Sequence, residues 1–311
     1  RLLKGVLIMK NKINIKIIFA FITLIIASLL LLIILIHSNG SLPSWLPFQF
    51  SIIIGIILLS GTSFLCFIIK DFRSLLKYNI ILIVILGLEM LLNFIGKTDF
   101  WKTNFPTDSF IGNFGGSILL KFLQIIPIIL IMLIMYRSFK EFYLCKGNLS
   151  VKAEKIGWLG IEADRISWRK LSLISAICIS LGTLLLTVLT VPNLSSISLA
   201  WSRFFKYLPI IILFAIVNSF CEGVLFRTTF LGTLKNALPK PYVIIIAAAF
   251  FGIAHYYGAP SGPIGVVMSA ILGWYMCRSM YETKGFLSSW IIHSLQDLVI
   301  FSSMCLMGNF I

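Results

Sequence analysis

The chain has 311 residues, of which 59% are hydrophobic and only 12% charged, and its mean hydropathy is +1.01. Soluble domains carry about 25% charged residues, so this composition excludes a water-soluble globular protein and predicts one that lies mainly in lipid. The net charge of +15 does not indicate a nucleic-acid binder, because the Lys and Arg residues separate apolar blocks instead of forming one basic run.

The first apolar run follows a short basic segment. Met9, with Lys10, Lys12 and Lys16 after it, would make a conventional start, and the sequence leaves open whether the chain starts there or upstream. The run ends without a small-x-small cleavage pattern. We therefore interpret it as a retained membrane helix.

Runs of roughly 20 apolar residues are long enough to cross the hydrocarbon layer as helices, which satisfy every backbone polar group internally. The sequence therefore predicts an all-α fold. This fold is a polytopic integral membrane helix bundle of about nine transmembrane helices, at residues 17–36, 50–69, 79–96, 118–136, 171–191, 207–226, 242–257, 263–279 and 286–308.

The Lys and Arg residues are distributed unevenly between the two sides of this bundle. With the N-terminus inside, 21 of the 26 lie on the inner side, and the other five are Lys97, Lys102, Lys121, Arg203 and Lys206. Because cytoplasmic loops are enriched in Lys and Arg, we expect the N-terminus in and the C-terminus out. The Ile-, Lys- and Asn-rich composition favours a bacterial cytoplasmic membrane as the location of this multi-pass protein.

Four segments follow from this organisation. Residues 1–136 hold the first four helices, and residues 137–170 form a cytoplasmic connector expected to contain an amphipathic surface helix. Residues 171–204 hold the fifth helix and an outer loop, and residues 205–311 hold the last four helices.

Few ionisable residues fall inside the predicted spans. The acidic ones are Glu89, Glu222 and Asp297, and the histidines are His255 and His293. Such groups are costly in a bilayer, so each is a functional candidate unless a partner explains it. Four of the five lie in the last four helices, which predicts a polar site there. Glu89 is expected to be a buried structural partner within the bundle.

Three short motifs bring these residues together. Glu222 to Arg227 in CEGVLFR, Phe251 to His255 in FFGIAH, and His293 to Asp297 in HSLQD resemble, in order, the three motifs of the CPBP family of intramembrane endopeptidases (CAAX protease and bacteriocin-processing). The resemblance covers about residues 205–311 and implies a four-helix catalytic core. One position departs from it, because Gly223 stands where the family has a second Glu.

The resemblance implies that Glu222 and His255 polarise a water that attacks a scissile peptide carbonyl. His293 would donate a hydrogen bond to the developing oxyanion, and Asp297 would either hold a proton or orient His293. Arg227 would pair with Glu222 or anchor the substrate. The expected partners are the lipid bilayer and a membrane-associated peptide or protein substrate.

Other interpretations stay open at this point. The enzyme would need no cofactor in the glutamate mechanism, but Glu222, His255 and His293 could also hold a divalent metal such as zinc. A proton-coupled transporter would use the same residue types. A catalytically silent membrane scaffold or bacteriocin-immunity factor would fit the loss of the second Glu at Gly223.

Overall fold

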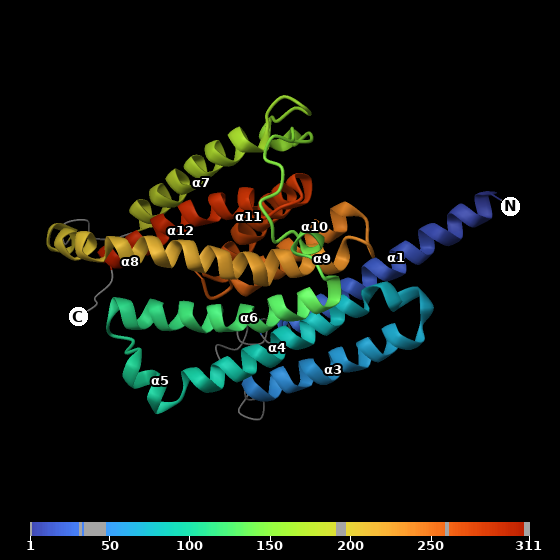
Figure 1. Cartoon of the computed structure of the whole chain (residues 1–311), viewed down its shortest axis with the longest axis horizontal. Helices are drawn as coiled ribbons and strands as arrows, with labels where there is room; N and C mark the ends of the chain where they lie inside the picture. Colours follow the sequence, from blue (N-terminus) through green and yellow to red (C-terminus); the bar gives the residue numbers. More distant parts are fainter. Residues whose placement is uncertain (1, 31–32, 34–47, 191–196, 259–260, 308–311) are drawn as a thin grey trace. The chain divides into compact units, whose positions relative to one another are not determined.

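The computed structural model describes residues 2–30, 33, 48–190, 197–258 and 261–307, and α-helices dominate them (Figure 1). Within these ranges the only extended pairings are two isolated β-bridges, so the predicted all-α fold is confirmed. The helices form two compact units, each assembled from three separate segments of the chain.

Unit 1 comprises residues 1–91, 128–142 and 225–278. Its helical elements are α1 (Leu2–Ala27), α3 (Phe48–Ile68), most of α4 (Leu76–Gly96), the end of α6 (Gly116–Tyr136), the π-helical turn Val224–Thr228, α9 (Thr229–Leu234), α10 (Lys240–Ala254) and most of α11 (Gly262–Thr283).

Close packing joins α10 to α11 in unit 1. A Cβ at Gly252 would lie 2.7 Å from the Cβ of Ala270, and a Cβ at Gly273 would lie 2.9 Å from the Phe251 ring. Small residues at such crossings let two helix backbones approach closely. This packing fixes the last turn of α10, which carries Phe251 and leads into His255.

Unit 2 comprises residues 92–127, 143–224 and 279–311. Its helical elements are α5 (Asp99–Asn104), the π-helical turn Ile111–Gly115, the first part of α6, α7 (Trp168–Thr190), α8 (Ile197–Gly223) and α12 (Leu287–Met307). Helix α12 packs against both α7 and α8. An aromatic cluster around Phe110, Phe214 and Phe301 fills one end of the contact between α8 and α12.

Six helices within the described ranges are long and apolar enough to cross a membrane, at Phe48–Ile68, Lys70–Gly96, Ile111–Tyr136, Trp168–Leu189, Trp201–Leu234 and Leu287–Met307. Many apolar side chains on them point outward, as Ile57 (63% exposed) and Leu189 (72% exposed) do. Helices that expose apolar faces are those whose surroundings are lipid. The chain is therefore a multi-pass membrane protein.

The three other predicted spans correspond to different features. The span 242–257 falls on α10, a shorter apolar helix, and the span 263–279 falls on α11. The first span overlaps α1, and most of its last residues, 31–32 and 34–36, lie outside the described part of the chain. The count of nine helices and the orientation of the termini stay predictions.

The connector differs from the expectation of a surface helix. Between residues 137 and 167 the chain forms two short 3-10 helices, Phe139–Phe142 and Gly157–Leu159, and the two bridges Lys152 to Ser167 and Ile156 to Ile161. The amphipathic helix predicted there is wrong. The Cys145 carbonyl accepts a 2.7 Å hydrogen bond from the Phe286 amide, so backbone contacts with the start of α12 replace helical bonding.

Candidate active site

The C-terminal end of α8 presents two polar side chains on one face. Asn218 and Glu222 are separated by four residues, which places them one helical turn apart. Both are buried within unit 2, with Glu222 only 6% exposed. The Asn218 amide donates to Glu222 Oε1 across 3.2 Å, so the helical spacing becomes a direct contact.

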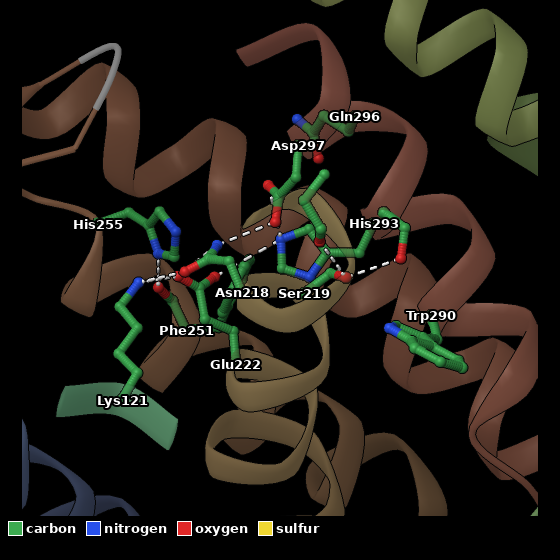
Figure 2. A network of polar contacts seen from close by, with 12 residues as sticks. Lys121, Asn218, Ser219, Glu222, Phe251, His255, Trp290, His293, Gln296 and Asp297 are labelled. Carbon is green, nitrogen blue, oxygen red and sulfur yellow. Dashed lines mark hydrogen bonds and ion pairs between the residues drawn. The ribbon is translucent and has the colours of Figure 1, made fainter. Parts of the chain in front are cut away.

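Helix α12 supplies a second pair with the same spacing. His293 and Asp297 are 3% and 4% exposed, and both point toward α8 (Figure 2). The Asn218 amide donates a second hydrogen bond, of 2.9 Å, to Asp297 Oδ2. Asn218 therefore links the Glu222 and Asp297 carboxylates.

The His293 imidazole lies between the two carboxylates. Its Nε2 is 3.5 Å from Glu222 Oε2 and 3.5 Å from Asp297 Oδ1. These distances are longer than ordinary hydrogen bonds, and catalytic contacts tighten when substrate binds. Nε2 is thus placed to exchange a proton with either carboxylate after a small movement.

Two further contacts set the register of α12 on α8. The hydroxyls of Ser219 and Ser294 are 2.7 Å apart, and the Trp290 indole donates a 3.1 Å hydrogen bond to the Ile216 carbonyl (Figure 2). The serine pair lies within about one turn of the carboxylates, and the Trp290 contact lies about two turns away. They therefore hold His293 and Asp297 at the level of Glu222.

A lysine from α6 completes this cluster. Lys121 Nζ is 2.5 Å from Glu222 Oε1 and 2.7 Å from Asn218 Oδ1. The Lys and Arg distribution placed Lys121 on the outer side of the membrane and did not identify it as a site residue. A Lys within an apolar span indicates a polar site, because a charge in lipid needs a partner. The helical pattern does not show which residue that partner is.

His255 and Arg227 belong to unit 1. His255 Nδ1 lies 2.7 Å from the Phe251 carbonyl, and the centroids of the two rings are 4.3 Å apart, so Phe251 packs against the imidazole. Arg227 is fully buried, with its guanidinium 5.5 Å from the centroid of the Phe251 ring. The convergence of these two residues with Glu222 stays a prediction.

Glu89 lies on α4, also in unit 1. Its side chain is exposed, so the expectation that the bundle buries it is wrong. Helical periodicity shows which residues share a face but does not show which face packs against a neighbour.

The metal set predicted from the sequence spans both units, because Glu222 and His293 lie in unit 2 and His255 lies in unit 1. Among the residues that the structure describes, no three His, Cys, Asp or Glu side chains are grouped as a metal site requires. Within unit 2, the Lys121 ammonium lies beside Glu222 Oε1. Metal dependence stays a hypothesis.

Comparison with known proteins identifies the segment that holds these residues. Residues 204–299, a little under a third of the chain, match the family model of type II CAAX prenyl endopeptidases, Rce1-like. No curated protein and no solved structure matches the chain. The match includes most of α8, all of α9, α10 and α11, and α12 through Val299. Residues 204–299 are thus similar to the Rce1-like CAAX endopeptidase domain, and this similarity is consistent with the predicted CPBP family.

Proposed function

We propose that the protein is an intramembrane endopeptidase in which Glu222 activates a water to hydrolyse a peptide bond of a membrane-associated protein or peptide. One observation carries the proposal: Glu222, His293 and Asp297 form a buried cluster inside the segment that matches a peptidase family.

The two oxygens of Glu222 have different surroundings. Oε1 accepts from Lys121 and Asn218, whereas Oε2 faces His293. We assign Oε2 as the general base, because it faces the His293 imidazole on the side away from Lys121. In the proposed reaction it takes a proton from water as the water oxygen attacks the scissile carbonyl carbon.

His293 and Asp297 act on the charge that this attack creates. An Nε2–H of His293 donates to the oxyanion of the tetrahedral intermediate. Asp297, held by Asn218, orients the imidazole for this role. The proton on Glu222 then moves to the amine nitrogen, and the C–N bond breaks. His255 is proposed to polarise the same water, and Arg227 to anchor the substrate.

The test uses purified protein in lipid nanodiscs with two synthetic substrates, a prenylated C-terminal peptide and an unprenylated apolar peptide. Glu222→Gln and His293→Gln are expected to lower the rate of cleavage by at least about 10²-fold. Glu89→Gln is the matched control, since it neutralises another carboxylate in a membrane-spanning helix outside this cluster. Cleavage that persists in both site variants would overturn the proposal.

The same variants separate the rival functions. Proton-coupled flux that is lost in Glu222→Gln, without any peptide cleavage by the wild type, would favour a transporter. Protection against a peptide toxin that survives both substitutions would favour a silent scaffold or immunity factor. Loss of cleavage on chelation, with recovery on adding zinc, would favour the metal-dependent form.

A further inference from the structure

Lys121 carries its charge inside a membrane-spanning helix, Ile111–Tyr136. An ammonium group in the hydrocarbon region is costly unless it has a charged partner. Its two short contacts, to Glu222 Oε1 and Asn218 Oδ1, both lie in the polar cluster of unit 2 (Figure 2). The side chain is therefore directed at the proposed base.

The two carboxylates of this cluster need a positive charge beside them if both are to be ionised. Glu222 and Asp297 are both more than 90% buried and are joined through one amide. Two carboxylates in one buried site disfavour each other's ionisation. Lys121 supplies one permanent positive charge, and His293 supplies a second only when it is protonated.

The charges within unit 2 can balance. One Lys and one protonated His offset the two carboxylates of Glu222 and Asp297. Lys121 is the member of this set whose positive charge does not depend on the protonation of an imidazole.

We propose that Lys121 is a positioning residue whose ammonium keeps Glu222 ionised and holds Oε1, so that Oε2 is the atom that accepts the proton from water. This inference rests on the proposed function for its role in hydrolysis. Its electrostatic part concerns only Glu222 and is measurable without a substrate.

A purely structural ion pair between α6 and α8 would behave differently. Packing and hydrogen bonding would be largely restored by a neutral donor, as in Lys121→Gln. The proposed role needs the charge, which Lys121→Arg retains and Lys121→Gln loses. Lys206→Met is the matched control, because Lys206 also lies in a membrane-spanning helix of unit 2 but contacts Tyr207.

The direct measurement is infrared spectroscopy of the protein in lipid nanodiscs at pH 7, following the carbonyl stretch of protonated carboxyl groups. Lys121→Gln is expected to gain such a band, and the band should vanish in the double variant Lys121→Gln/Glu222→Gln. Wild type, Lys121→Arg and Lys206→Met should show no band that Glu222→Gln removes. If Lys121→Gln fails to fold, Lys121→Met, which keeps the apolar stem, is measured in the same way.

A folded neutral variant without the new band would overturn the inference, since Glu222 would then stay ionised without Lys121. If the band appears but the wild type cleaves neither peptide, the counter-charge role stands and the peptidase proposal fails. With an active enzyme, Lys121→Gln should lower kcat about 10- to 100-fold and leave KM nearly unchanged, and Lys121→Arg should recover most of the rate. A change in KM alone would contradict the positioning role.

Discussion

The side-chain amide of Asn218 donates a 2.9 Å hydrogen bond to the Asp297 carboxylate, and this contact joins α8 to α12 beside the proposed base. The amide oxygen of Asn218 faces Lys121, which orients the amide so that its nitrogen faces the carboxylates. The neutral Asn218 side chain thus lies between the Lys121 ammonium and the Asp297 carboxylate.

Replacing Asn218 by Leu should therefore weaken both the fold and the reaction. Two buried carboxylates would each lose a donor, and an unsatisfied buried polar group costs about 1–3 kcal/mol. Equilibrium unfolding in detergent micelles measures the loss. Asn104→Ala, an exposed change on α5, is the control and should change stability by less than about 0.5 kcal/mol. Equal stability of the two variants would contradict the bridging role of Asn218.

Glu282 anchors the connector to unit 2. Its Oε2 accepts hydrogen bonds from the Trp168 indole, at 2.8 Å, and from the Glu154 amide, at 3.0 Å. Trp168 is fully buried, so Glu282→Ala should leave its N–H without this acceptor and cost about 1–3 kcal/mol. Glu162→Ala removes only an exposed pair with Lys155 and should cost under about 1 kcal/mol. Denaturant unfolding of the two variants provides the comparison.

Gly147 should not tolerate a side chain. Its φ is +74°, and an added Cβ would lie 2.7 Å from the Gly285 Cα. Gly147→Ala is expected to destabilise the protein by about 1–3 kcal/mol and to expose residues 143–167 to proteases. Gly182→Ala, at a helical position with nothing within 4 Å, should instead be neutral or stabilise by roughly 0.5–1 kcal/mol. Protease resistance equal to the wild type in Gly147→Ala would contradict the close approach.

The ion pair of Glu141 with Lys235 in unit 1 predicts a pH dependence. A 2.7 Å hydrogen bond from Lys235, together with its charge, holds the pKa of the Glu141 carboxyl below its ordinary value. A lowered pKa in the folded state contributes stability that is present above the ordinary pKa and is lost as the pH falls through the lowered one.

The midpoint of thermal unfolding should therefore be higher for wild type than for Glu141→Gln at pH 7. The difference should shrink as the pH falls below the folded-state pKa of Glu141, and salt should also reduce it because the Glu141 side chain is exposed. A difference that persists at strongly acidic pH would point to packing instead of charge.

Local periodicity accounts for much of the site. A spacing of four residues is sufficient to place His293 and Asp297 on one helix face and Asn218 beside Glu222, and the structure shows both contacts. The same reasoning failed for the connector, where bonding with residues near 283–286 replaced a local helix. Local periodicity also gave the wrong burial for Glu89, because the face of a helix that becomes buried depends on the neighbouring helices.

By itself, the sequence determined that the protein lies in the membrane as apolar helices and that its acidic and His residues gather near the C-terminal end. Composition and local spacing are sufficient for this, because helix formation and lipid exposure are local properties. Only the tertiary structure decided that Lys121 is the partner of Glu222, a residue 101 positions away. That contact depends on how α6 packs against α8, and the local pattern of neither helix contains this information.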